Sequence, residues 1–170
     1  MPGTIHTQWV LISVCIGYTV LLPLAFISLA KRIGFIGSLR NMQRKERILS
    51  LVITGICIYS FSYVMKGWHT PITMQSFVFG AAIMIFISLI LSTFSRISLH
   101  SIGWGGLTAL VSYFSFSQPD LSWLFALVVL LSGLVGTARI YLEEHTPRQI
   151  YFGYLIGFFT IWTTFVVRAL

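Results

Sequence analysis

Charge is the scarcest property of this sequence. Only 9% of its 170 residues are Asp, Glu, Lys or Arg, whereas soluble domains have about 25% of such residues. The four acidic residues are too few to favour a magnesium site, which needs oxygen ligands such as carboxylates. Both cysteines, Cys15 and Cys57, lie in apolar stretches, so we interpret them as core residues rather than a disulfide or metal-binding pair. These deficits exclude an ordinary soluble domain.

Long uncharged stretches take the place of a charged surface. They cover residues 1–30, 48–65, 67–95, 97–119, 121–138 and 149–167. A bilayer core needs roughly 17–25 apolar residues per helix, and these stretches lack the polar alternation of barrel strands. The sequence therefore predicts an all-α fold, a six-helix transmembrane bundle with short loops, as a single integral membrane domain over residues 1–170. The helices are expected near 9–30, 48–65, 72–94, 102–117, 121–139 and 149–168.

The predicted topology divides the polar residues unevenly. Six crossings put both termini on one side and loops 31–47, 95–101 and 139–148 on the other, which we call the three-loop face. This face holds His100, His145 and nine of the eleven Lys and Arg residues. Basic loops beside membrane helices favour membrane lipids or a phosphorylated substrate as partners, and not nucleic acid. Any functional site is therefore expected on the three-loop face.

One candidate site lies between the last two predicted helices. Thr146, Pro147 and Gln149 have the pattern of a helix N-cap, a first-turn proline and a capping box. His145 therefore stands just before a helix N-terminus, where free N–H groups favour anions. With Arg139 nearby, such an imidazole could attack phosphorus and form a phosphohistidine. Alternatively, His145 is an interfacial histidine and the arginine simply flanks a helix.

A second candidate is His100, which lies close to Ser98 and just before a predicted glycine-rich helix start. Its pKa near neutrality would suit a general acid for a leaving oxygen. The glycines that follow, Gly103, Gly105 and Gly106, allow close approach of either another helix or a ligand.

A third candidate is the basic loop from Arg40 to Arg47, which includes Arg44. Guanidinium groups bind phosphate oxygens bidentately. Membrane topology alone also produces basic loops, so phosphate binding is one of two interpretations.

Together these segments resemble the type 2 phosphatidic acid phosphatase superfamily of integral membrane lipid phosphatases. The resemblance covers roughly residues 40–157, with three motifs in the family's order on one face. The family's third motif, Ser-Arg, five residues, His, three residues, Asp, is similar to Ala138-Arg139, five residues, His145, three residues, Gln149. Its second, Pro-Ser-Gly-His, is similar to Ile97-Ser98-Leu99-His100, and its first, Lys, six residues, Arg-Pro, to Arg40, six residues, Arg47-Ile48.

The resemblance implies a role for each candidate residue. His145 would be the nucleophile, His100 the acid that protonates the leaving group, and Gln149 the residue that orients His145. The phosphate would be bound by Arg139, Arg40, Arg47, Arg44, Ser98 and Arg96. No metal and no other cofactor would be required.

The departures from the family pattern bear on activity. Ala138 replaces Ser, Arg40 replaces Lys, and the prolines of the first two motifs are missing. The largest departure is Gln149 in place of Asp, because an amide accepts a hydrogen bond from imidazole but cannot stabilise imidazolium as a carboxylate does. Either Glu143 or Glu144 could substitute for that Asp, or activity could be weak or lost.

Two functions of different classes follow. The first is a membrane enzyme, a metal-independent lipid phosphate phosphatase that hydrolyses a phosphomonoester or diphosphate headgroup through a phosphohistidine. Candidate substrates are phosphatidic acid, phosphatidylglycerol phosphate, undecaprenyl diphosphate and a lipid A phosphate. The second is a non-catalytic lipid-phosphate binding or carrier protein, which Gln149 favours. A solute transporter is disfavoured, because the uncharged stretches provide no ionisable residue for a mid-membrane site.

The orientation in the membrane depends on how the cations are counted. Nine of eleven lie on the three-loop face, which would place it in the cytoplasm. If the arginines and the lysine of the phosphate-binding segments are set aside, the remaining cations are balanced. The family resemblance then implies a bacterial inner membrane protein whose site faces the periplasm.

Overall fold

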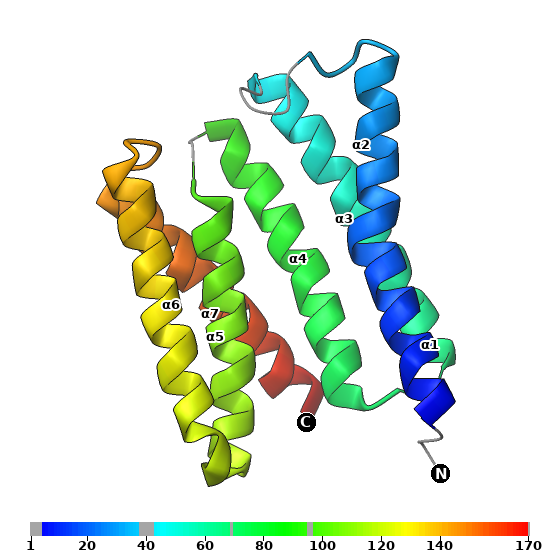
Figure 1. Ribbon diagram of the computed structural model, residues 1–170, viewed down its shortest axis with the longest axis vertical. Coiled ribbons are helices and arrows are strands. Elements are labelled where there is room, and N and C mark those ends of the chain that lie inside the picture. The colour runs from blue at the N-terminus through cyan, green and yellow to red at the C-terminus, as the bar shows by residue number, and fades with distance from the viewer. Residues whose placement is uncertain (1–4, 38–42, 69, 95–96, 170) are drawn as a thin grey trace.

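The computed structural model describes residues 5–37, 43–68, 70–94 and 97–169. Within these ranges the chain forms helices and no β-strand (Figure 1). Five described segments are long and apolar enough to span a membrane: Trp9–Arg32, Arg44–Gly67, Ile72–Phe94, Pro119–Tyr141 and Pro147–Arg168. The sixth long helix, α5 (Leu99–Ser117), is not among these five segments and packs on both α6 and α7. The predicted all-α bundle is confirmed.

The first span is one rod with an irregular turn near its middle. It consists of α1 (Ile5–Ile16), the π-helical turn η1 (Gly17–Leu21) and α2 (Leu22–Arg32). Pro23 follows the irregular turn directly, and a proline cannot donate the helical hydrogen bond and crowds the preceding turn. A wider π turn before it relieves this conflict, which explains the position of η1.

The remaining helices are α3 (Arg44–Gly67), α4 (Ile72–Phe94), α5, α6 (Ser122–Tyr141) and α7 (Pro147–Ala169), with the short 3₁₀ helix η2 (Pro119–Leu121) before α6. Both α3 and α5 begin earlier than the apolar pattern indicates, because capping side chains extend them. At α3 the Glu46 carboxylate accepts from Gln43 N at 2.7 Å. At α5 the Ser98 Oγ accepts from Ser101 N at 3.4 Å, so His100 lies inside the first turn rather than before it.

The helices form a row in which neighbours run in opposite directions, except α7 and α5, which run in the same direction. The rod α1–η1–α2 packs on α3, α3 on α4, and α4 on α7, while α5 packs on α7 and on α6. The ends of α2, α4 and α6 and the starts of α3, α5 and α7 lie together at the top of Figure 1, and both chain termini lie at the opposite end. The three-loop face is therefore a real surface of the bundle.

The tightest helix contact joins α5 to α7. A Cβ on Gly157 would overlap the Ile102 carbonyl, and a Cβ on Gly105 would overlap the Tyr154 carbonyl. Only glycine allows two helix backbones to approach this closely, as is common for helix pairs in membranes. Gly103 has no such packing role, since a Cβ at this position would meet no atom within 4 Å.

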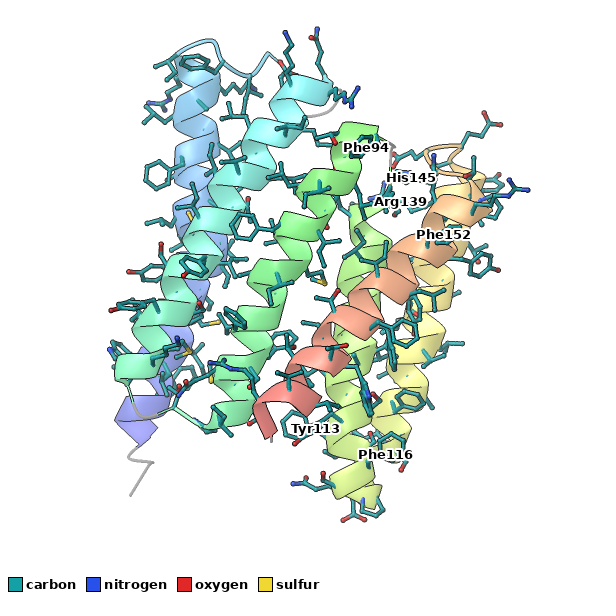
Figure 2. All side chains as sticks on the ribbon, turned by 180° about the vertical axis from the view of Figure 1, so that it is seen from behind. Phe94, Tyr113, Phe116, Arg139, His145 and Phe152 are labelled. Atoms are coloured by element: carbon teal, nitrogen blue, oxygen red, sulfur yellow. The ribbon has the colours of Figure 1, made fainter. Side chains whose placement is uncertain are left out.

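The outside of the bundle is apolar, as a lipid-facing surface should be. Phe94 is 84% exposed at the end of α4, and Phe116 is 80% exposed near the end of α5 (Figure 2). Such fully exposed aromatic side chains are unfavourable in water and favourable in a bilayer, where rings also concentrate near the interfaces. The protein is an integral membrane protein.

Candidate active site

The turn between α6 and α7 brings the third motif into one cluster. The N–H of Leu142 donates to Ala138 O at 3.0 Å, and the N–H of Glu144 donates to Arg139 O at 3.2 Å. Glu143 takes a positive φ of 53°, which reverses the chain sharply. His145 is thereby placed beside the last turn of α6, where Arg139 projects (Figure 2).

The start of α7 has the predicted capping box. Gln149 N donates to Thr146 Oγ1 at 3.4 Å, and Thr146 N donates to Gln149 Oε1 at 3.1 Å. Pro147 is the first helical residue, as predicted. The free N–H groups of this helix end therefore lie beside His145.

Gln149 also contacts the imidazole of His145. Its Oε1 lies 3.1 Å from His145 Nδ1. Because Oε1 already accepts from a backbone N–H, it must be the amide oxygen, so Nδ1 is the donor in this contact. A neutral His145 then has its lone pair on Nε2, the nitrogen remote from Gln149. The contact fixes the tautomer that a nucleophilic histidine requires.

Arg139 links the second motif to the third. Its Nη2 lies 2.9 Å from Nδ1 and 2.7 Å from Nε2 of His100. Its Nη1 is paired with the Glu144 carboxylate. A guanidinium has donors only, so a ring nitrogen can accept from Arg139 only where it carries no proton, which favours the neutral form of His100.

The electrostatics of His100 agree with that assignment. His100 lies in the first turn of α5, at the three-loop face and outside the five apolar spans. Partial loss of solvent lowers the pKa of its imidazole, and the adjacent charge of Arg139 lowers the same pKa further. The Glu144 carboxylate acts against these effects and raises the pKa of His100, whereas His145 lowers it. A bound phosphate would reverse the effect, because a nearby anion favours the protonated ring.

Close packing at the start of α5 holds the two histidine segments together. Ser98 is fully buried and caps α5. A Cβ on Gly153 of α7 would lie only 3.0 Å from the Ser98 carbonyl. This structural role accounts for Ser98, and phosphate binding by its hydroxyl stays a prediction.

The starts of α5 and α7 both point to the three-loop face, so two positive helix ends converge near Arg139. Arg139 itself occupies the last turn of α6, where a cation is favoured by the negative end of that helix. The cluster is therefore electropositive and suits an anion such as phosphate.

Only two of the four arginines predicted to bind phosphate outside the third motif lie within the described residues. Arg47 Nη2 donates to Ser92 O at 3.5 Å, which directs this side chain toward the loop end of α4. Arg44 is exposed at the first residue of α3. Arg40 and Arg96 lie outside the described residues, so their predicted phosphate contacts stay predictions.

Sequence reasoning missed the role of Glu144. It was a candidate substitute for the orienting Asp, but its carboxylate pairs with Arg139, while Gln149 itself contacts His145. The two paired residues are separated by a helix end, where no periodicity relates side-chain positions. Only the geometry of the turn shows that they meet.

No three His, Cys, Asp or Glu side chains within the described ranges lie close enough to hold a metal ion.

A comparison with protein-family models assigns the sequence to a family. The model of the PAP2 superfamily matches residues 78–169, more than half of the chain. The chain belongs to the PAP2 superfamily. The match includes His100, Arg139, His145 and Gln149, whereas the basic segment from Arg40 to Arg47 precedes it. Searches of curated proteins and of solved structures gave no match to this PAP2 chain.

We expect Glu144→Gln to tighten the binding of inorganic phosphate, because Glu144 competes with an anion for Arg139. The Arg139 and Glu144 side chains are 21% and 49% exposed. Since such pairs are worth roughly 0.2–1 kcal/mol, the gain should be no more than about fivefold in Kd. Titration calorimetry in detergent measures it.

The matched control is Glu143→Gln, which makes the same charge change at the neighbouring residue and should alter Kd less. Weaker phosphate binding by Glu144→Gln would instead show that the carboxylate orients Arg139 for its ligand.

Proposed function

We propose that this PAP2 protein is a lipid phosphate phosphatase that uses His145 as a nucleophile. The observation that carries the proposal is the contact between Gln149 Oε1 and His145 Nδ1, which leaves the lone pair of the imidazole on Nε2, in a residue that lies near Arg139 (Figure 2). A helix N-terminus adds donors for phosphate oxygens at the same place. A histidine that merely lay at the membrane interface would not need a fixed tautomer beside an anion-binding cluster.

The reaction would proceed in two steps. The substrate phosphate first replaces Glu144 and His100 as the partner of Arg139. His145 Nε2 then attacks phosphorus, the bond to the leaving oxygen breaks, and His100, protonated once the phosphate anion is bound, donates a proton to that oxygen. In the second step a water transfers a proton to His100 and attacks the phosphohistidine, which releases orthophosphate. No step requires a metal.

The substrate would be a lipid phosphomonoester or diphosphate, because the cluster lies at the end of a lipid-exposed bundle. A lipid could present its headgroup there while its chains stay in the bilayer. Phosphatidic acid, phosphatidylglycerol phosphate, undecaprenyl diphosphate and lipid A phosphates form the test panel.

The alternative function is binding or carrying a lipid phosphate without turnover. Gln149 favours it, since an amide cannot offset the charge of an imidazolium as a carboxylate would.

Replacement of the nucleophile tests the proposal directly. His145→Ala should reduce phosphate release more than about a thousandfold, as expected for loss of a nucleophile. The assay is orthophosphate release by protein in detergent with a chelator present, across the lipid panel. Wild type quenched during turnover with a ³²P-labelled lipid should also show an acid-labile phosphoprotein that His145→Ala lacks.

Unchanged elution and thermal stability of His145→Ala would exclude unfolding as the cause of its loss. Full activity in this variant would contradict the nucleophile. Binding of lipid phosphates by a wild type that releases no phosphate would support the carrier function instead.

Gln149→Glu tests the orienting contact. It keeps an oxygen at the position that contacts His145 and adds a negative charge that favours the protonated form of the imidazole. We expect kcat to be maintained or raised and the acid limb of the pH profile to move to higher pH. Gln149→Leu should lower kcat at least about tenfold, because the ring loses its orienting acceptor.

Thr146→Val is the matched control for these variants. It removes the other side of the capping box but leaves the contact between Gln149 and His145. An equal loss of kcat in Thr146→Val and Gln149→Leu would show that Gln149 acts only as a helix cap and does not orient His145.

We further propose that the protein lies in a bacterial inner membrane with the three-loop face in the periplasm. The chain termini lie at the opposite end of the bundle (Figure 1), so the C-terminus would be cytoplasmic. Green fluorescent protein fused to the C-terminus of the full-length chain should then be fluorescent, and alkaline phosphatase fused at the same place should be inactive. The reverse pair of results would place the site in the cytoplasm.

A further inference from the structure

A groove of about 370 Å³ runs down the bundle beside the candidate site. Its lining comes from α5, α6 and α7, and includes Trp104, Val129, Gly133, Ile140, Ile150 and Tyr154. The groove is formed because α6 and α7 both pack on α5 and make little contact with each other below their connecting turn. Its size is at the lower end of the range of small-molecule sites, about 300–1,000 Å³.

One end of the groove adjoins the cluster of charged and polar side chains. Ile140, Ile150 and Ser101 line it, and they directly follow Arg139, Gln149 and His100 in the chain. On each of three helices, a residue of the candidate site is therefore followed in the sequence by a residue that lines the groove. A ligand whose phosphate is bound at Arg139 would have the remainder of its structure at the mouth of this groove.

The depth of the groove matches one leaflet of a bilayer. On α6 its lining runs from Val129 to Ile140, which corresponds to about 16 Å at roughly 1.5 Å per residue. The hydrocarbon core of a bilayer is about 30 Å thick. The groove therefore reaches from the three-loop face to about the middle of the membrane.

The surface of the groove suits a hydrocarbon rather than a polar ligand. Its lining is mostly aliphatic and aromatic. Two of its hydroxyls are bonded within α6, since Ser132 Oγ donates to Val129 O at 2.8 Å and Thr137 Oγ1 donates to Gly133 O at 2.9 Å. These groups therefore present their hydrocarbon parts to a ligand without an unmet donor.

We propose that this groove holds one hydrocarbon chain of the substrate lipid while its phosphate lies at Arg139 and His145. The inference rests on the proposed phosphatase function and adds the determinant of chain recognition. Moving a chain from lipid into an apolar groove yields little hydrophobic free energy, because both surroundings are apolar. The benefit is positional, since a held chain limits how the phosphate can meet His145.

Gly133→Leu tests the groove with little risk to the fold. A Cβ at Gly133 would meet no atom within 4 Å, so a larger side chain starts there in open space and extends into the groove that Gly133 lines. Ala126→Leu is the matched control, because it adds a leucine at an exposed position of α6 outside the groove lining.

The measurement is kcat/KM for a long-chain lipid phosphate and its short-chain counterpart, using dioleoyl and dihexanoyl phosphatidic acid and undecaprenyl and farnesyl diphosphate. Gly133→Leu should lower kcat/KM at least about fivefold for the long-chain member of a hydrolysed pair, since misplacement of a reacting group is costly. The value for the short-chain member should change less than about twofold, and Ala126→Leu should resemble wild type with both.

Three results would overturn the inference. Wild-type kcat/KM of Gly133→Leu with the long chain would show that the groove is not used. Equal losses with both chain lengths would show a disturbed site rather than a blocked chain. A wild type that hydrolyses none of the four lipids would contradict the phosphatase function and the groove's role with it, which distinguishes that failure from the first two.

Discussion

The contact between α5 and α7 is the constraint on which the candidate site depends. Gly105 and Gly157 let two backbones meet where any Cβ would overlap a carbonyl. The approach continues at Gly153, which accommodates the Ser98 carbonyl. Because His100 begins one helix and His145 precedes the other, this packing determines whether they share a site at all. In lipid, where apolar burial hardly favours one helix pair over another, such close packing supplies the specificity.

The electrostatic arrangement of the cluster follows from that packing. Two helix N-termini converge on Arg139, whose charge is paired with Glu144 and whose guanidinium also contacts His100. The same contacts define what a phosphate must replace. Gln149 combines two roles, because one oxygen both caps α7 and fixes the proton on His145 Nδ1. An amide meets both demands without charge, which explains how the cluster is maintained although the orienting carboxylate of the family motif is missing.

Most of the fold could be predicted from the uncharged stretches, because lipid permits few alternatives to helices. The helix cap at Thr146 could also be predicted, because the residues that form it are neighbours in the sequence. The start of α5 could not be predicted in this way, because the apolar pattern alone assigns the segment around Ser98 to a loop. At the site, motif spacing indicated His100, Arg139 and His145 as a group. The ion pair of Glu144 and the contact of Arg47 with α4 depend on a turn and on helix packing, which no local pattern encodes.

The position of α5 between α6 and α7 relates the charged cluster to the groove. A helix that faces lipid needs an apolar surface around much of its circumference, whereas α5 packs on both α6 and α7. It carries several glycines and serines and a histidine in its first turn. Gly105 lets α7 approach closely, and the groove lies beside Trp104 between α5, α6 and α7. The cluster at the surface and the groove below it are thus two consequences of one enclosed helix, and a change in its packing should alter phosphate binding and chain binding together.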